Sequence, residues 1–88
     1  MDSIITHKAI LYNDDNNTFD YVVACLIKFC GHTLIQAEQC ALIAHNKGEC
    51  QIASGTFDEI FTLINTFHEL VDITCAIEPY ESNLHRRV

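Results

Sequence analysis

Two short segments, Thr33-Leu34-Ile35-Gln36 and Thr56-Phe57-Asp58-Glu59, place a threonine three residues before a glutamine or glutamate. This is the capping-box pattern, in which the two side chains satisfy backbone N–H groups at the start of a helix. The two boxes fix the starts of two helices within a chain of 88 residues. The rest of the fold has to be arranged around these two helices.

A third helix is predicted ahead of the two boxes, with Asn17 or Thr18 as its N-cap. Apolar residues recur behind each of the three caps at helical spacing. In the helix after Thr56 the expected stripe is Ile60, Ile64, Phe67 and Val71. The predicted ends of the first two helices are about Phe29, closed by Gly31, and about Asn46, closed by Gly48.

Three short segments have the composition or the alternation of strands: residues 6–12, 50–53 and 73–78. Pro79 is expected to stop the pairing of the last one, because proline lacks the N–H that a ladder needs. The order strand, helix, helix, strand, helix, strand predicts an α+β fold. We expect a two-layer sandwich in which a three-stranded antiparallel sheet is covered on one face by three helices.

Length and composition indicate one domain over residues 1–88, with a folded part of about 5–79. Residues 80–88 are polar and without periodicity, and we expect them to form a loose tail. The longest apolar runs are far shorter than the roughly 20 residues that span a bilayer. No signal peptide is visible after Met1, so a cytoplasmic protein is expected.

The chain has 12 acidic and 5 basic residues and a net charge of -7, which argues against binding nucleic acid. An acidic surface suits amine-bearing or basic partners, and it also keeps a small protein soluble. Five cysteines cannot all pair within the chain, so reduced thiols and a reducing compartment are expected. No Cys-x-x-Cys or His-x-x-x-His pair occurs, and we expect no metal, no cofactor and a monomer.

Polar residues that could bind a cation follow the first predicted strand. Asn13, Asp14 and Asp15 stand between that strand and the next helix. Such residues favour turns by themselves, so an ordinary turn is the simpler interpretation. His45 lies near the end of the second helix, where a histidine is also favoured by the helix dipole alone. If this helix faces the loop, however, its small residues would leave an apolar recess with polar groups at its mouth.

Taken together, four segments resemble the ClpS family of adaptors, which recognise N-degrons for Clp-family AAA+ proteases. The resemblance covers roughly residues 7–78. The segments are Ile10-Leu11-Tyr12-Asn13-Asp14-Asp15, Phe19-Asp20-Tyr21-Val22, Gln36-Ala37 and Ala44-His45-x-x-Gly48, in matching order and at matching spacing.

The resemblance implies a role for each matching position. Asn13, Asp14 and His45 would contact the α-amino group of a peptide's first residue. His45 would then need a ring nitrogen that accepts, so acid should weaken binding. Asp15 and Asn17 would shape the loop or contact the peptide backbone. The implied pocket walls are Ile10, Phe19, Ala41, Leu42, Ala44 and Ile73, any of which could equally be a plain core residue.

The family resemblance also implies partners. Two other functions remain as alternatives. The partners would be a ClpA- or ClpC-like AAA+ ATPase and proteins that begin with Phe, Tyr, Trp or Leu. Relatives commonly have Met at the positions of Phe19 and Ala41, so the pocket would be reshaped here. One alternative is a docking domain that modulates a Clp ATPase or another partner without an N-degron pocket. The other is an acid–base or metal-dependent enzyme that uses Asp14, Asp15 and His45, for which no supporting motif is present.

Overall fold

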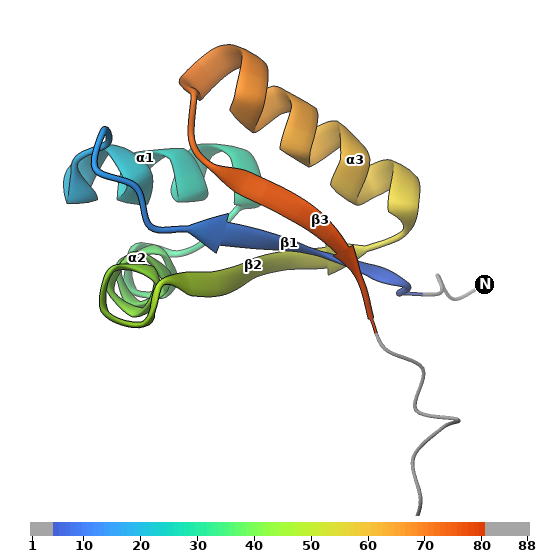
Figure 1. Cartoon of the computed structure of the whole chain (residues 1–88), viewed down its shortest axis with the longest axis horizontal. Helices are drawn as coiled ribbons and strands as arrows, with labels where there is room; N and C mark the ends of the chain where they lie inside the picture. Colours follow the sequence, from blue (N-terminus) through green and yellow to red (C-terminus); the bar gives the residue numbers. More distant parts are fainter. Residues whose placement is uncertain (1–4, 81–88) are drawn as a thin grey trace, which may run out of the picture.

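The computed structural model describes residues 5–80, which form one antiparallel sheet in the order β2-β1-β3 with helices packed on it (Figure 1). The predicted α+β fold and its order of elements are confirmed. No helix within this part of the chain is long and apolar enough to cross a membrane. The elements are β1 (His7–Tyr12), α1 (Phe19–Cys30), α2 (Leu34–Lys47), β2 (Glu49–Gly55), α3 (Phe57–Thr66), the π-helical turn η1 (Phe67–Val71) and β3 (Cys75–Pro79).

Each of the three α-helices begins at a threonine cap. Thr18, rather than Asn17, caps α1, and its hydroxyl accepts a hydrogen bond from the N–H of Tyr21. Both predicted capping boxes are present at α2 and α3. The caps therefore define the helix starts locally, before any tertiary contact is made.

One face of the sheet carries the core. Ala9 and Leu11 of β1 lie in a single buried cluster with residues from every helix, among them Leu26 of α1, Ala37 of α2 and Ile64 of α3. All three helices therefore pack on the face of β1 to which Leu11 points, because alternate strand residues face opposite sides. The opposite face carries polar pairs as well as the buried Ile10: the Tyr12 hydroxyl donates to Glu78, and the Gln51 amide donates to the Tyr80 hydroxyl.

β3 extends further than the sequence pattern predicts at its C-terminal end. Pro79 is paired with His7, and the N–H of Tyr80 donates to the Thr6 carbonyl. Because the Tyr80 N–H points toward β1, the Pro79 nitrogen points to the open edge of the sheet, where no donor is needed. The prediction that Pro79 stops the pairing is thus wrong, and Tyr80 belongs to the folded part. Residues 81–88 of the predicted tail lie outside the described residues.

α3 does not continue as one regular helix through its apolar stripe. It changes at Phe67 into the π-helical turn η1, which ends at Asp72. Asp72 has a positive φ of 55°, a conformation that aspartate tolerates better than most residues. Phe67 is completely buried and packs edge-on against Phe29 of α1, with 5.9 Å between ring centroids. The π turn therefore keeps this ring in the core while the chain reverses toward β3.

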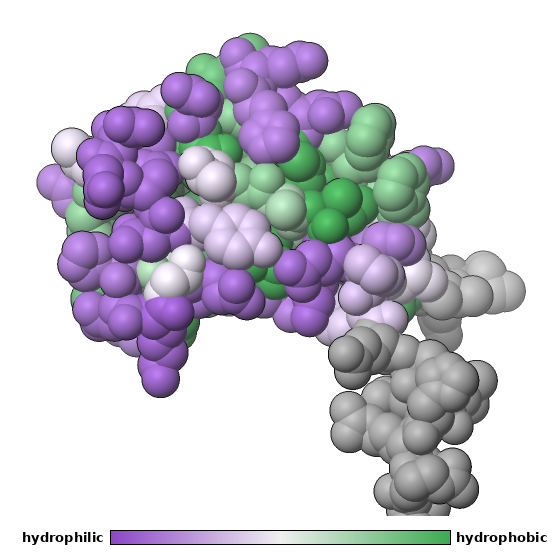
Figure 2. Space-filling model, in the orientation of Figure 1, coloured by the Kyte–Doolittle hydropathy of each residue, from purple (hydrophilic) through white to green (hydrophobic). Residues whose placement is uncertain are grey.

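Polarity is unevenly distributed over the surface. In the view of Figure 1, hydrophilic side chains cover the end that holds α1 and α2, while apolar ones gather toward α3 (Figure 2). Two exposed rings on α3, Phe57 and Phe61, stack with centroids 5.4 Å apart, and His7 of β1 lies edge-on to Phe57.

Candidate functional site

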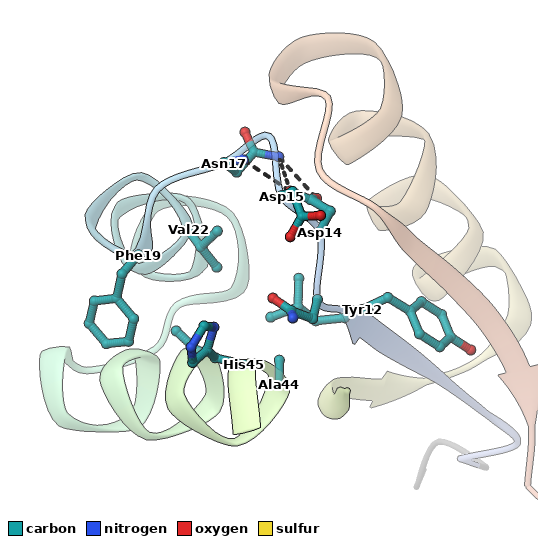
Figure 3. Close-up of a pocket in the computed structure, with 11 residues that line it drawn as sticks. Tyr12, Asp14, Asp15, Asn17, Phe19, Val22, Ala44 and His45 are labelled. Carbon is teal, nitrogen blue, oxygen red and sulfur yellow. Dashed lines mark hydrogen bonds between the residues drawn. The ribbon is translucent and has the colours of Figure 1, made fainter. Parts of the chain in front are cut away.

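The end of β1 is joined to the end of α2 by one backbone hydrogen bond. The N–H of Asn13 donates to the carbonyl of Gly48 over 3.0 Å. Gly48 closes α2 with a φ of 98°, which side chains rarely allow. Because α2 ends in this way, His45 in its last turn comes to lie near the loop that follows β1 (Figure 3).

That loop is organised by the carboxylate of Asp14. Its Oδ1 accepts hydrogen bonds from the backbone N–H groups of Asn16 and Asn17, each at 3.0 Å. The side-chain amide of Asn17 donates to both oxygens of the same carboxylate, at 3.2 and 3.1 Å. This local pattern is typical of aspartate in turns. The role of shaping the loop, predicted for Asp15, therefore falls to Asp14.

Two opposing effects set the pKa of Asp14. Burial raises it, but hydrogen bonds from the side chain and backbone of Asn17, the backbone of Asn16 and the hydroxyl of Thr74 outweigh burial and leave the pKa below its ordinary value. Donors around a carboxylate favour its charged form. The loop thus holds a negative charge at neutral pH.

The loop is also fastened to the turn before β3. The Asn17 amide nitrogen donates to the Asp72 carbonyl over 3.2 Å, and the Tyr21 hydroxyl donates to the Val71 carbonyl over 3.2 Å. Both acceptors belong to the end of η1 or its cap, so the π turn supports the loop from one side. Sequence reasoning missed Tyr21 and Asp72, because nothing local in the chain indicates that residues some fifty positions apart meet.

A cavity of about 300 Å³ lies between this loop, the start of α1 and the second half of α2 (Figure 3). Ala41 and Ala44 of α2 are buried at its inner wall, and their small side chains leave the space open. Phe19 is 43% exposed at the side of α1. The lining is Leu11, Tyr12, Asn13, Asp14, Asp15, Asn17, Phe19, Val22, Ala41, Ala44 and His45.

The structure brings the predicted polar residues together at this cavity. Asn13, Asp14 and His45 all line it, as do Asp15 and Asn17. Within residues 5–80 the side chains of Asn13, Asp15 and His45 have no hydrogen-bond partner, so their polar atoms remain available. Figure 3 shows His45 rising from α2 toward the loop, and its dashed lines join the carboxylate of Asp14 to Asn17 within that loop.

Three of the six predicted wall residues lie elsewhere. Ile10 is buried, but it points to the face of the sheet opposite Leu11. Ile73 is fully buried within the core cluster, and Leu42 is 45% exposed because it lies on another side of α2 from Ala41 and Ala44. The lining therefore differs from the prediction at these three positions.

Leu11, Tyr12 and Val22 complete the lining, and sequence reasoning missed them. Tyr12 contributes through its part nearest the backbone, because its ring points away from the cavity and its hydroxyl donates to Glu78 over 3.0 Å (Figure 3). Val22 points into the cavity from α1, one turn after Phe19. The i, i+3 spacing of these two residues was the available signal.

Residues 5–80 contain no group of three His, Cys, Asp or Glu side chains placed to hold an ion. The arrangement can instead accept hydrogen bonds from a cationic group at its mouth and enclose an apolar group beneath it.

Comparison with known proteins identifies the fold and the family. The family model described as ATP-dependent Clp protease adaptor protein ClpS matches residues 5–72. The chain belongs to the ClpS family.

Two relatives illustrate the extent of the similarity. The ATP-dependent Clp protease adapter protein ClpS of Desulforapulum autotrophicum is 34% identical over 64 residues, which are 73% of this chain and 62% of that protein. The chain thus spans somewhat less than two thirds of this relative. The structure of Agrobacterium tumefaciens ClpS2 bound to L-phenylalaninamide superposes with a TM-score of 0.75 at 17% identity, covering 86% of this chain and 98% of that one. This second likeness confirms the ClpS fold.

The hydrogen bonds of Asp14 predict a pH-dependent contribution to stability. Because its folded pKa is lowered, this contribution is fully present above the pKa of the unfolded chain and is lost as the pH falls through the folded pKa. Between about pH 5 and about pH 2 the free energy of unfolding should therefore fall more steeply in the parent than in Asp14→Asn. Denaturant unfolding at a series of pH values measures the two slopes.

The matched control is Asp15→Asn, which removes a neighbouring carboxylate that accepts no hydrogen bond within residues 5–80. This variant should keep the steep pH dependence of the parent. Equal slopes for the parent and Asp14→Asn would contradict the proposed stabilisation of the loop by Asp14.

Proposed function

We propose that this chain is a non-enzymatic adaptor that binds the free N-terminal residue of a protein and delivers that protein to a Clp AAA+ unfoldase. The preferred first residues are bulky and hydrophobic: Phe, Tyr, Trp or Leu. The observation that carries the proposal is the cavity whose inner wall is formed by Ala41 and Ala44. Asn13, Asp14 and His45 also line this cavity. The unfoldase would be ClpA- or ClpC-like, as membership of the family supports.

An α-ammonium group has three N–H donors, and the cavity offers three kinds of acceptor for them. The Asn13 side chain and the imidazole of His45 are unoccupied within residues 5–80. Asp14 supplies the negative charge; its Oδ1 accepts three hydrogen bonds, and its Oδ2 accepts one from the Asn17 amide at 3.1 Å. Charge-assisted hydrogen bonds of this kind are roughly twice as strong as neutral ones.

The first side chain would enter the recess between α1 and α2. About 300 Å³ is at the lower end of ligand pockets, which suits one large side chain and excludes a folded partner. Leu11, Val22 and the two alanines provide apolar contacts, and burying a Leu or Phe side chain contributes about 1.5–3 kcal/mol.

The peptide backbone beyond the first residue would pass Asn17. The nitrogen of its amide is committed to Asp14 and Asp72, so the oxygen is the atom left to accept a peptide N–H. This division of roles lets Asn17 hold the loop and contact the substrate at the same time.

A binding role is favoured over catalysis by the composition of the lining. It contains no serine, threonine, cysteine or lysine that could act as a nucleophile. His45 has no hydrogen bond within the described residues 5–80, whereas a general base is normally oriented by a second group. These features support an adaptor without enzymatic activity.

The competing function is a docking domain that uses no amine site. The exposed stacked rings of Phe57 and Phe61 on α3 are the feature that favours it. The two functions differ in one requirement, because only the adaptor needs a free amino terminus on its partner.

Amine recognition predicts how binding responds to acetylation and to loss of an acceptor. A fluorescent peptide that begins with Phe should bind, and its N-acetylated twin should not, because acetylation removes the positive charge. Asn13→Ala and His45→Ala should each weaken binding about 10-fold or more, the effect of losing about 1.5–3 kcal/mol from a hydrogen bond to a charged group. Fluorescence anisotropy measures the dissociation constants.

The matched control is Asn46→Ala, which alters the residue next to His45 on α2 without touching the cavity. Its affinity should stay within about twofold of the parent, since it removes no proposed contact. Asp14 is unsuitable for this test because its carboxylate also builds the loop. Undiminished binding of the acetylated peptide would rule out the amine site and leave the docking function.

The small side chain of Ala41 should set the size of the first residue that is accepted. Ala41→Met adds atoms to the inner wall of the cavity, so peptides that begin with Trp or Phe should lose more affinity than one that begins with Leu. Ala24→Met, at an exposed position of α1, is the control and should leave all three affinities unchanged. An equal loss of affinity for the three peptides would show that Ala41 does not control the size of the first residue that the cavity accepts.

Delivery predicts faster degradation of a reporter protein that begins with Phe. A Clp ATPase, its peptidase and ATP should degrade this reporter faster when the chain is added, and the His45→Ala variant should give no acceleration. A reporter that differs only in beginning with Ser is the control. If the parent binds Phe peptides but does not accelerate degradation, the delivery role fails and the binding role stands.

A further inference from the structure

We propose that Cys40 and Cys50 form a site of reversible thiol modification, which takes a low-molecular-weight disulfide as its oxidant and closes into a disulfide that tethers α2 to β2. This site lies outside the peptide cavity, and its chemistry does not depend on peptide binding.

The two thiols converge from different elements on one atom. The Sγ of Cys40, on α2, lies 3.9 Å from the carbonyl oxygen of Gln51, and the Sγ of Cys50, on β2, lies 3.4 Å from the same oxygen. The Cys40 thiol is also within hydrogen-bonding reach of the Cys50 thiol. Rotation of two side chains that are only half-buried can therefore bring the sulfurs together.

The surroundings make Cys40 the first thiol to react. It lines an open groove of about 500 Å³ between α2 and β2, together with His32, Gln39 and Gln51, so a small disulfide can reach it. Cys50 is not part of this groove. Burial and the neighbouring Cys40 raise the pKa of the Cys50 thiol to about 12, so Cys50 is a poor first nucleophile.

The reaction has two exchange steps. The thiolate of Cys40 attacks one sulfur of the small disulfide, so a mixed disulfide forms and one small thiolate leaves. The sulfur of Cys50 then attacks that of Cys40, the bond to the small thiol breaks, and the leaving thiolate takes up the proton that Cys50 releases. The two cysteines lose two electrons and two protons, and the small disulfide is reduced to two thiols.

The bond would close a ring that contains the end of α2, His45 and the Gly48 turn. The oxidised chain would therefore hold the helix that bears one wall of the cavity more firmly against the sheet. Crosslinks of this kind stabilise chiefly by restricting the unfolded chain.

Cys30 is the competing partner for Cys40. It is the last residue of α1, it is half-buried, and it lies close enough for the charges of Cys40 and Cys75 to affect it. Burial raises its pKa to about 12, as it does for Cys50, so thiol acidity does not distinguish the two partners. Geometry does: Cys50 shares the Gln51 carbonyl with Cys40, and Cys30 does not.

The test is incubation of the full chain with oxidised glutathione, followed by digestion without reduction. A glutamate-specific protease releases residues 39–49, which contain Cys40, and residues 50–59, which contain Cys50, and neither peptide holds another cysteine. Mass spectrometry should first find glutathione on the 39–49 peptide and later the two peptides linked. Two thiols should be lost, and excess dithiothreitol should restore both.

Two variants and one control keep the result specific. Cys40→Ser and Cys50→Ser should each give no linked peptides, whereas Cys30→Ser should give the same linkage as the parent. The thermal midpoint of the linked parent should rise by roughly 10–20 °C. Linkage of the 39–49 peptide to the one that holds Cys30, glutathione persisting on Cys40 without linkage, or an unchanged thermal midpoint would overturn the proposal.

Discussion

The candidate site depends on the backbone hydrogen bond from Asn13 to Gly48, because this bond joins its two halves. Asn13 follows the central strand, and Gly48 ends the helix that carries His45. Only a residue without a side chain adopts a φ of 98° readily, so glycine at this position ends α2 and sends the chain into β2 beside β1. Because Glu49 comes directly after Gly48, it lies opposite Tyr12 and begins the antiparallel pairing of β1 with β2. The geometry of the site is therefore a consequence of how the sheet is paired, and a rigid sheet holds it in place.

Under the proposed function, the single side chain of Asp14 would serve both folding and binding. Three hydrogen bonds reach its Oδ1, all from residues that follow it closely in the chain. These bonds fix the loop and keep the group charged, so the proposed amine contact would be organised before a peptide binds. Preorganisation of this kind lowers the entropy lost on binding. The attachment of Asn17 to the Asp72 carbonyl extends the same network to the π turn, a kind of irregularity that is often found at functional sites.

The sequence predicted the features that local chemistry determines and failed where tertiary packing decides. Thr33 and Thr56 were predicted correctly as caps, because a capping box acts within four residues. The polar residues of the site were indicated by their positions after the first strand and near the end of the second helix, and their roles came from the family resemblance. Of the predicted walls, Phe19, Ala41 and Ala44 line the cavity. Ile10 does not, because Ala9, Ile10 and Leu11 are all apolar and their pattern does not reveal which of them faces the helices. β1 and β2 also shift register between Ala9 and Ile10, which no local pattern indicates. Likewise, the stripe from Ile60 to Val71 predicted continuous helix, whereas the structure changes at Phe67, a fully buried residue, into the π turn.

The composition of α2 connects the fold to the proposed function. Its buried residues are Ala37, Ala41 and Ala44, while Ile35 is 72% exposed and Leu42 is 45% exposed. An amphipathic helix normally turns its large apolar side chains toward the core. Here the inward face is small, so the helix can lie close to the sheet at Ala37 and leave a recess at Ala41 and Ala44, where the loop and α1 form the opposite wall. Larger residues at those two positions would bury more apolar surface and favour stability. The alanines therefore favour an open cavity at the expense of core packing, and a cavity of this kind is expected where a ligand supplies the missing side chain.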